Sequence, residues 1–372
     1  MNLPCPPLPA ADLEHILAHT GPLWRELAGS RIFITGGTGF FGIWLLETLT
    51  AANDLLKADV GATVLSRDPQ RFLARMPHLA KRSEFDWLCG HPANFPFPDR
   101  RHDYILHLAT ATSPHLDRTD PIEMLQTKLA SIRHILDYAR HTRVRRMLVT
   151  SSGAVYGPQP QELSHIPETY SGAPDPMNPA SAYGQGKRLV EQMCALTPEV
   201  PCVIARCFSF IGPHLPLNAR FAAGNFLRDA INGGPIVVHG DGTPLRGYLY
   251  ASDLVIWLLK LLLVGVPGRP YNVGSDLAID LAALAAKVAR IAGPIAVKRL
   301  LRPDDKPPTR YVPDLARARE ELGLKVWTDL SVALERTLRF AGNSNATSRI
   351  HCGCKNMAQL LYACMTNHHQ QR

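Results

Sequence analysis

The sequence predicts an α/β protein built on a parallel sheet with helices on both faces. Apolar, β-forming runs alternate with helix-like segments from residue 31 to about residue 205. Alternation at this spacing is typical of parallel strands that are joined by crossover helices and buried on both faces. Beyond Gly212 the pattern loosens into short elements rich in Pro and Gly. This change indicates a smaller lobe that closes over the carboxyl edge of the sheet.

We expect five strands and three helices in the alternating region. The strands are Ile32–Thr35, Ala62–Ser66, Tyr104–Ala109, Arg146–Thr150 and Val200–Ala205. The helices that connect them are Ile43–Lys57, Pro121–His141 and Ala180–Leu196. The stretch Asp68–Arg101 contains several prolines and is expected to be less regular.

The same pattern divides the chain into four parts. Residues 1–29 form an N-terminal extension, whose amphipathic helix from about Ala11 to Leu27 is expected to pack on the domain without a chemical role. Residues 30–212 carry the alternating pattern, and residues 213–340 form the smaller lobe, with some elements that return to the sheet. Residues 341–372 are polar and lack a clear pattern, so we expect an irregular tail.

A strand, a glycine-rich turn and a helix follow one another at Arg31–Gly42, RIFITGGTGFFG. Glycines at these positions permit a tight turn, let backbone N–H groups approach a pyrophosphate and let the helix pack on the strand. An ordinary loop is the alternative, but the flanking strand and helix are the context that a dinucleotide motif requires. The sequence therefore predicts a Rossmann-type doubly wound sheet that binds NAD or NADP at the helix N-terminus, through Gly36, Gly39, Phe40, Phe41 and Gly42.

Composition argues against several other classes of protein. The formal net charge is +8, but the basic residues form no stripe interleaved with aromatic residues, so we predict an anionic substrate rather than nucleic acid. The longest apolar run, Leu254–Val266, contains Lys260 and is shorter than a membrane span, which predicts a buried helix and no membrane partner. No secretory signal is visible, and five of the eight cysteines have no paired spacing, so we expect a cytoplasmic protein.

The tail contains six residues of types that bind zinc. Their spacing is not that of a standard zinc finger, and one C-x-C pair is a weak signal. We therefore predict no metal site among His351, Cys352, Cys354, Cys364, His368 and His369.

Tyr183 and Lys187 are four residues apart at the start of a predicted helix, so they share one helix face. A tyrosine with an ordinary pKa near 10 is a poor base at neutral pH, but a nearby ammonium and a nicotinamide cation favour its phenolate. Exposed surface residues are the alternative interpretation. The strand that ends at Ser151 and Ser152 argues against it, because these hydroxyls would lie at the carboxyl edge of the sheet, beside the same substrate oxygen.

Four motifs, GGTGFFG, HLATA, SSGAVYG and YGQGK, together resemble the extended short-chain dehydrogenase/reductase family, in its nucleotide-sugar epimerase/dehydratase branch. The resemblance covers about Arg31 to Phe340. It implies a catalytic set of Ser152, Tyr183 and Lys187. Tyr183 and Lys187 would also contact the cofactor, with Lys187 on the nicotinamide ribose, and further cofactor contacts are implied at His107 and Ala109. The resemblance also implies a nucleoside-diphosphate sugar as substrate, contacted by Ser152, Asn225, Arg246, Arg302 and Arg310. Family members usually form homodimers through the helices that correspond to Pro121–His141 and Ala180–Leu196.

The chain departs from the family pattern at positions that carry chemistry. The 4,6-dehydratases have Asp-Glu directly after the catalytic hydroxyl, and the decarboxylases keep the Glu, whereas this chain has Gly153 and Ala154. The second strand ends in Ser66 and Arg67 rather than in an acidic residue, which favours NADP modestly over NAD, although an Arg67 that faces solvent would leave NAD binding intact. His91 and Ser209 also replace residues that many members share, an adenine-contacting Asp and an Asn.

These features leave four functions, of which we favour the first. A C4 epimerase would oxidise the sugar to a transient 4-keto intermediate and return the hydride after the sugar has rotated. A reductase would receive a nucleoside-diphosphate 4-keto-6-deoxy sugar from another enzyme. A dehydratase or decarboxylase is less favoured, because its carboxylates are missing. A non-catalytic NAD(P)-binding regulator is the alternative of a different class, but such proteins typically lose the Tyr or the Lys that this chain keeps.

Overall fold

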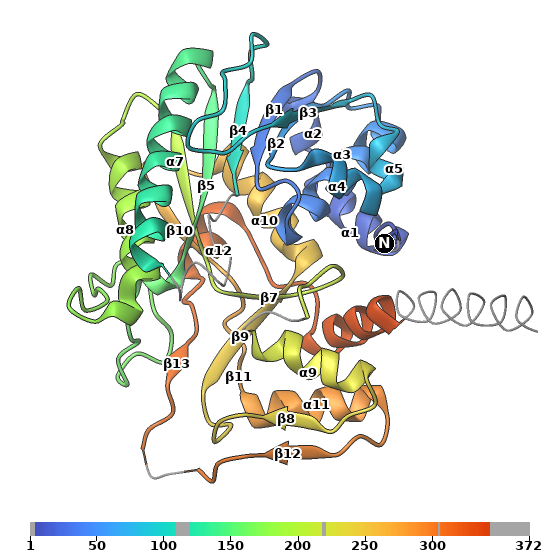
Figure 1. Cartoon of the computed structure of the whole chain (residues 1–372), viewed down its shortest axis with the longest axis vertical. Helices are drawn as coiled ribbons and strands as arrows, with labels where there is room; N and C mark the ends of the chain where they lie inside the picture. The colour runs from blue at the N-terminus through green and yellow to red at the C-terminus, as the bar shows by residue number, and fades with distance from the viewer. Residues whose placement is uncertain (1–3, 109–119, 218–220, 304–305, 343–372) are drawn as a thin grey trace, which may run out of the picture.

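The computed structural model describes residues 4–108, 120–217, 221–303 and 306–342. These residues form a central seven-stranded sheet with the strand order β10-β6-β5-β4-β1-β2-β3, and every neighbouring pair is parallel (Figure 1). Its strands are β1 Arg31–Thr35, β2 Gly61–Ser66, β3 Phe85–Cys89, β4 Tyr104–His107, β5 Arg146–Ser152, β6 Cys202–Cys207 and β10 Pro270–Val273. The predicted doubly wound fold is confirmed.

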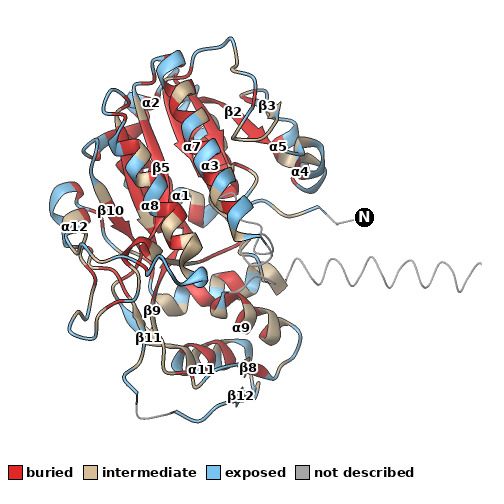
Figure 2. Ribbon diagram, turned by 60° about the vertical axis from the view of Figure 1, so that its left-hand side comes forward, coloured by how far each residue is buried: buried red, intermediate tan, exposed pale blue. Residues whose placement is uncertain are grey.

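Helices cover both faces of this sheet because each strand alternates its apolar side chains between two cores. In β1, Ile32 and Ile34 belong to one core and Phe33 to the other. The first core lies under α3 (Phe40–Leu56) and α10 (Ala251–Val264), and the second lies under α7 (Pro121–Thr142) and α8 (Ala182–Ala195). Figure 2 shows α7 and α8 with their exposed sides turned outward and their buried sides toward the sheet.

Strand order reverses between β1 and β4, and this reversal fixes the position of a ligand crevice. From β1 the chain runs outward through β2 to β3, whereas β4, β5 and β6 lie on the other side of β1. The carboxyl ends of β1 and β4 therefore form the switch point at which open parallel sheets bind their ligands.

The N-terminal extension packs on the sheet domain, as predicted, but its single predicted helix is two helices. α1 (Ala10–Thr20) ends at Gly21, and Pro22 precedes α2 (Leu23–Leu27). The proline has no N–H to continue the hydrogen-bond pattern of α1, so the chain turns there.

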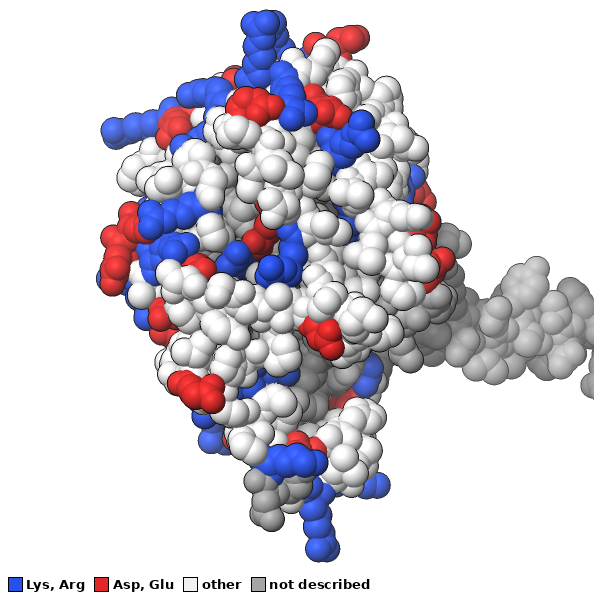
Figure 3. Space-filling model, turned by 90° about the vertical axis from the view of Figure 1, so that its left-hand side faces the viewer, with Lys and Arg blue, Asp and Glu red and all other residues white. Residues whose placement is uncertain are grey.

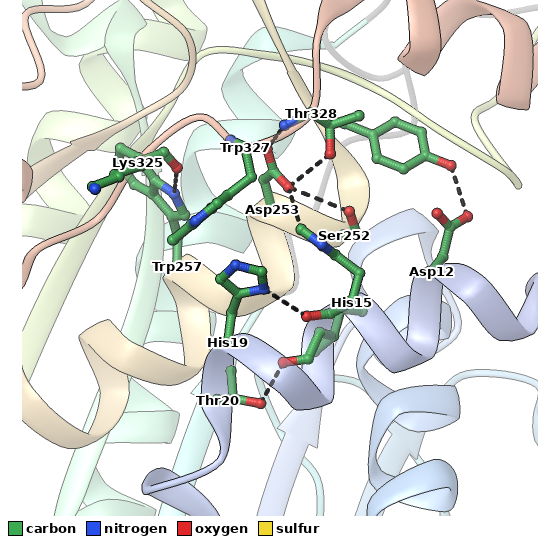
Figure 4. Close-up of polar contacts among 12 residues, drawn as sticks. Asp12, His15, His19, Thr20, Ser252, Asp253, Trp257, Lys325, Trp327 and Thr328 are labelled. Atoms are coloured by element: carbon green, nitrogen blue, oxygen red, sulfur yellow. Dashed lines mark hydrogen bonds and ion pairs between the residues drawn. The ribbon is translucent and has the colours of Figure 1, made fainter.

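Two buried carboxylates fix this extension to α10 and the C-terminal region (Figure 4). Asp253 of α10 accepts hydrogen bonds from His15 Nε2 at 3.2 Å and from the backbone N–H groups of Trp327 and Thr328 at 2.8 Å. Asp12 of α1 accepts one from the Tyr250 hydroxyl at 2.8 Å. Each carboxylate is satisfied by several donors, which offsets the cost of burying its charge.

A second, smaller lobe follows β6. In it β9 pairs with β7, β11 and β13, and β8 pairs with β12. α10 and β10 return from this lobe to the large sheet, as expected, and α12 (Ala316–Leu322) and a helix from residue 330 follow. The lobe's elements are β7 Ser209–Ile211, α9 Ala222–Ile231, β8 Ile236–Val238, β9 Leu245–Tyr250, β11 Ala278–Asp280, α11 Leu281–Ala292, β12 Val297–Arg299 and β13 Arg310–Tyr311.

The stretch that was expected to be irregular contains regular elements. α4 (Pro69–Arg75), α5 (Pro77–Ala80) and the edge strand β3 all lie within Asp68–Arg101. In β3 Phe85 alone is fully buried, so the strand lacks the continuous apolar run that marks a central parallel strand.

The face formed by α7 and α8 carries charges of both signs (Figure 3). Lys and Arg side chains alternate there with Asp and Glu, with uncharged surface between them. Exposed apolar side chains on or next to these helices include Ile122, Leu129, Leu189 and Leu196. The homodimer expected through these helices stays a prediction, which the mass of the protein in solution would test.

None of the helices within the described ranges is long and apolar enough to cross a membrane. The apolar run near residue 254 forms the buried helix α10, as predicted. In the same part of the chain, no cluster of three or more His, Cys, Asp or Glu residues is placed to hold a metal ion. The tail residues His351 to His369 lie outside the described residues.

His102 joins the sheet to α7 from inside the protein. Its ring nitrogens lie 2.5 Å from the Tyr138 hydroxyl and 2.8 Å from the Thr63 hydroxyl. Burial, with a smaller contribution from Arg100, lowers the pKa of His102 to about 4. Burial likewise lowers the pKa of His214 to about 4.

These buried histidines predict an acid-sensitive fold. Between pH 6.5 and 4, His102 binds a proton in the unfolded chain but stays neutral in the folded protein. The free energy of unfolding therefore falls as pH falls through this window. We expect His102→Gln to flatten this dependence by on the order of 2 kcal/mol across the window, although it lowers stability at pH 7. Urea unfolding at several pH values measures both effects. His239→Gln, at an exposed position, is the control, and an unchanged slope in His102→Gln would contradict the assignment.

Candidate active site

The glycine turn after β1 has the shape that a diphosphate requires. Gly36 has a φ of +74°, a conformation that residues with a Cβ rarely adopt. A Cβ at Gly42 would lie 2.3 Å from the backbone of Gly37, so α3 contacts the turn directly. α3 begins at Phe40 with no side-chain cap and no acidic residue in its first turn, which leaves its first N–H groups for an anion. The residues present therefore fit a dinucleotide cofactor, and contact with Gly36, Gly39, Phe40, Phe41 and Gly42 stays a prediction.

The end of β2 offers the cofactor a hydroxyl and a guanidinium instead of a carboxylate. Ser66 Oγ accepts a hydrogen bond from the N–H of Asp68 at 3.2 Å, and the Asp68 carboxylate caps α4. Arg67 is exposed beside His91, whose pKa is lowered by burial and by the Arg67 charge. The carboxylate of Asp68 thus caps a helix, and Arg67 and Glu123 both contribute charge beside His91.

Lys187 is buried at the carboxyl edge of β5. Its Nζ donates a hydrogen bond to the carbonyl of Thr150 at 2.6 Å, and burial lowers its pKa to about 8. His107, at the end of β4, lies near enough for the Lys187 charge to contribute, after burial, to lowering its pKa to about 3. His107 therefore stays neutral at pH 7, and its Nδ1 lies 2.8 Å from the Thr35 hydroxyl at the end of β1.

A backbone contact brings the elements that carry Tyr183 and Ser152 together. A Cβ at Gly184 would lie 2.6 Å from the carbonyl oxygen of Ala154, so α8 touches the short 3₁₀ helix η1 (Gly153–Tyr156). Tyr183 precedes this contact on α8, and Ser152 ends β5 just before η1. Ser152 Oγ accepts a hydrogen bond from the N–H of Ala154 at 3.2 Å.

Of the two adjacent serines, Ser151 is already committed to structure. Its hydroxyl donates to Glu191 Oε1 at 2.5 Å, and Glu191 also pairs with Arg206 at 2.7 Å. This arrangement leaves Ser152 as the hydroxyl that faces the candidate site.

Sequence reasoning missed two residues beside this group. Lys128 of α7 is buried, and its Nζ lies 4.8 Å from the centre of the Tyr183 ring. A lysine on the same helix face as the buried Met124 and Ile132 was a signal that could have identified it. Tyr311 of β13 places its hydroxyl 3.3 Å from Ser152 Oγ. No local pattern marks Tyr311, because 159 residues separate it from Ser152.

The expected substrate residues lie at different places. Arg246 of β9 is opposite Tyr311 in the parallel register, and its guanidinium is 5.7 Å from the centre of that ring. Next to Tyr311, Arg310 has a buried Nε that makes no hydrogen bond within the described residues. Asn225 of α9 accepts a hydrogen bond from Arg228 at 3.2 Å. Arg302 is exposed. Substrate contact stays a prediction for all four.

The proposed cofactor contact Ala109 lies outside the described residues, which end at residue 108 before resuming at 120. The strand predicted to reach Ala109 is described as β4 as far as His107.

Comparisons with known proteins identify the family. The family model described as NAD dependent epimerase/dehydratase family matches residues 32–274. UDP-glucuronic acid decarboxylase 2 of Arabidopsis thaliana is 29% identical over 331 residues, which cover 85% of this chain and 69% of that protein. UDP-glucuronic acid decarboxylase 5 of the same plant is 30% identical over 310 residues, covering 79% of this chain and 84% of that protein.

Solved structures share the fold. An epimerase from Methanothermobacter thermautotrophicus superimposes with a TM-score of 0.71 at 23% identity, covering 90% of this chain and 98% of that one. A UDP-glucose 4-epimerase from Thermotoga maritima, solved with UDP-glucose, gives 0.69 at 19% identity, covering 84% and 99%.

The curated relatives are named for decarboxylation, a reaction that we predicted from the sequence to be less favoured than epimerisation. The predicted resemblance to extended short-chain dehydrogenase/reductases and the prediction of an enzyme are confirmed. The chain belongs to the NAD-dependent epimerase/dehydratase family.

Proposed function

We propose that this protein uses a nicotinamide cofactor to oxidise and re-reduce C4 of a nucleoside-diphosphate sugar. The observations that support the proposal are two contacts at the carboxyl edge of β5: Lys187 bonds the carbonyl of Thr150, and Gly184, next to Tyr183, touches the backbone of Ala154 just after Ser152. Arg246, whose guanidinium lies 5.7 Å from the centre of the Tyr311 ring beside Ser152, supplies positive charge for a diphosphate.

Each of the three residues has a distinct task at C4. The bound cofactor supplies the hydride acceptor and later the hydride. Tyr183 takes the proton of the C4 hydroxyl as the ketone forms and gives it back on reduction. Lys187, held by the Thr150 carbonyl, presents its ammonium on the same helix face and favours the phenolate of Tyr183. Ser152 hydrogen-bonds the C4 oxygen.

The residues after Ser152 favour the return of the hydride over elimination. A Cβ at Gly153 would lie 2.7 Å from the Phe208 ring and 2.8 Å from the Tyr311 hydroxyl oxygen, so this position has no room for an acid. Ala154 supplies a methyl group where a base would be needed. Without these carboxylates, removal of water from the sugar lacks its proton carriers. C4 epimerisation therefore remains our first choice.

Decarboxylation is the second candidate, and the names of the curated relatives favour it. Once C4 of a hexuronic acid is a ketone, the C5–C6 bond can break without a base, because its electrons flow into the enolate as CO₂ leaves. C5 must then gain a proton before the hydride returns to C4. Ala154 removes one possible donor of that proton, but it does not block the cleavage.

Three incubations separate these outcomes. Purified protein receives UDP-glucose with NAD, UDP-glucuronic acid with NAD, or a nucleoside-diphosphate 4-keto-6-deoxy sugar with NADPH. We expect a C4-inverted sugar without net NADH formation and without CO₂. Release of CO₂ with a UDP-pentose product would establish the decarboxylase, and NADPH consumption restricted to a 4-keto sugar would establish a reductase. No conversion of any of these sugars would contradict the proposal.

Tyr183→Phe tests the assignment of the acid/base residue in the same assay. We expect turnover to fall by about 10²- to 10⁴-fold, with NAD binding largely intact because the ring is retained. Tyr170→Phe is the matched control, since Tyr170 is a half-buried tyrosine outside the candidate site. Near-normal activity in Tyr183→Phe would overturn the role.

We further propose that the adenosine site accepts the 2′-phosphate of NADP through Arg67. The support for this preference is that β2 ends at Ser66 and is followed by Arg67 rather than by an acidic residue, and that the next carboxylate, Asp68, accepts the Arg71 N–H as a helix cap. Calorimetry should show that Arg67→Ala weakens NADP binding about tenfold and leaves NAD binding unchanged. Arg71→Ala removes an exposed charge nearby on α4 and serves as the control. Equal effects of Arg67→Ala on the two cofactors would disprove the contact.

A further inference from the structure

We propose that Tyr311 is a positioning residue, which sets the direction of the Ser152 hydroxyl so that Ser152 serves both the alcohol and the ketone form of the substrate. This inference rests on the proposed function, because it assigns a partner to the hydroxyl that contacts the C4 oxygen. It adds a residue from the smaller lobe to a catalytic group that otherwise belongs to the sheet domain.

The hydrogen-bond inventory around Ser152 leads to this role. The N–H of Ala154 donates to Ser152 Oγ at 3.2 Å, and the Tyr311 hydroxyl lies 3.3 Å from the same atom. The Tyr311 hydroxyl also lies 3.4 Å from the carbonyl oxygen of Cys207. Each hydroxyl has one hydrogen to donate, so two arrangements satisfy the group.

The two arrangements match the two oxidation states of C4. When Tyr311 donates to the Cys207 carbonyl, Ser152 donates to Tyr311 and keeps a lone pair for a substrate hydroxyl. When Tyr311 donates to Ser152, the Ser152 hydrogen is directed to the substrate, where a C4 ketone needs a donor. Burial raises the pKa of Tyr311 to about 12, so its hydroxyl keeps its proton at neutral pH.

The surroundings hold Tyr311 in place for this task. Its ring packs on Phe208 with centroids 4.6 Å apart, and a Cβ at Gly153 would clash with the Phe208 ring and the Tyr311 hydroxyl. The following residue, Val312, donates its N–H to Gln159 Oε1 at 2.9 Å and accepts from the N–H of Ile166 at 2.9 Å. The segment that carries Tyr311 is thus hydrogen-bonded to the loop that follows β5 and η1.

The same ring connects Ser152 to the candidate diphosphate site. The guanidinium of Arg246 lies 5.7 Å from the centre of the Tyr311 ring, and β13 pairs with β9 beside it. A Phe at position 311 keeps this ring contact and removes the hydroxyl alone. Tyr311→Phe therefore separates the positioning role from nucleotide binding.

A double-mutant cycle in the turnover assay tests the proposal. We expect Tyr311→Phe to lower kcat about 3- to 10-fold with little change in KM or NAD binding, and Tyr170→Phe to change kcat by less than twofold. If Tyr311 acts through Ser152, Tyr311→Phe causes no further loss in a Ser152→Ala background. A further loss of similar size in that background, or an unchanged kcat in Tyr311→Phe alone, overturns the proposal.

Urea unfolding of the wild-type protein, Ser152→Ala, Tyr311→Phe and their double variant gives a readout that does not depend on turnover. If the wild-type protein converts none of the sugars, the proposed function fails. The hydrogen bond between Ser152 and Tyr311 is then tested by unfolding alone. If the two hydroxyls are hydrogen-bonded to each other, we expect the urea midpoint shifts of Ser152→Ala and Tyr311→Phe to add up to more than the shift of the double variant. Additive shifts would show that the hydroxyls are not coupled, whatever the substrate is.

Discussion

The site depends on three places where the backbone or a ring leaves no room for a side chain. Gly42 meets the backbone of Gly37, Gly184 meets the carbonyl of Ala154, and Gly153 meets the rings of Phe208 and Tyr311. The first contact shapes the turn in the way a diphosphate requires, and the second joins α8, which carries Tyr183, to the backbone just after Ser152. The third leaves no room for a side chain at position 153. The proposed cofactor site and the proposed catalytic residues therefore depend on the same kind of steric constraint.

A buried network of polar side chains next to η1 supports these contacts. Arg206 pairs with Glu191 and donates to the Tyr156 hydroxyl at 2.9 Å, which in turn donates to Asn272 Oδ1 at 2.7 Å. Asn272 belongs to β10, the strand that returns from the smaller lobe to the large sheet. Because an unpaired buried charge is costly, the network tolerates few alternative arrangements. It fixes η1, and with it Ser152, relative to both parts of the protein.

The parts of the fold that sequence reasoning predicted are those with a local signal. The alternation of strands and helices and the turn at Gly36 depend on neighbouring residues, and the structure has them within a few residues of the expected bounds. β3 was missed because an edge strand needs no continuous apolar run. β10 was missed because its partner β6 lies 66 residues earlier in the register of Tyr271 and Ala205. Lys128 and Tyr311 reach the site through tertiary contacts, which no single-sequence pattern encodes.

The relatives and the site give different weight to the two candidate reactions. The similarity to UDP-glucuronic acid decarboxylases extends over most of the chain and so reflects the shared scaffold as much as the chemistry. The outcome at C4, by contrast, depends on what stands immediately after Ser152. A dehydratase must place two proton carriers there, whereas an epimerase must leave the keto sugar free to turn. Gly153 and Ala154 add no proton-carrying group at this point, and the Phe208 ring and the Tyr311 hydroxyl occupy the space that a side chain at position 153 would need. The local chemistry therefore favours return of the hydride over any reaction that requires a carboxyl group beside C5.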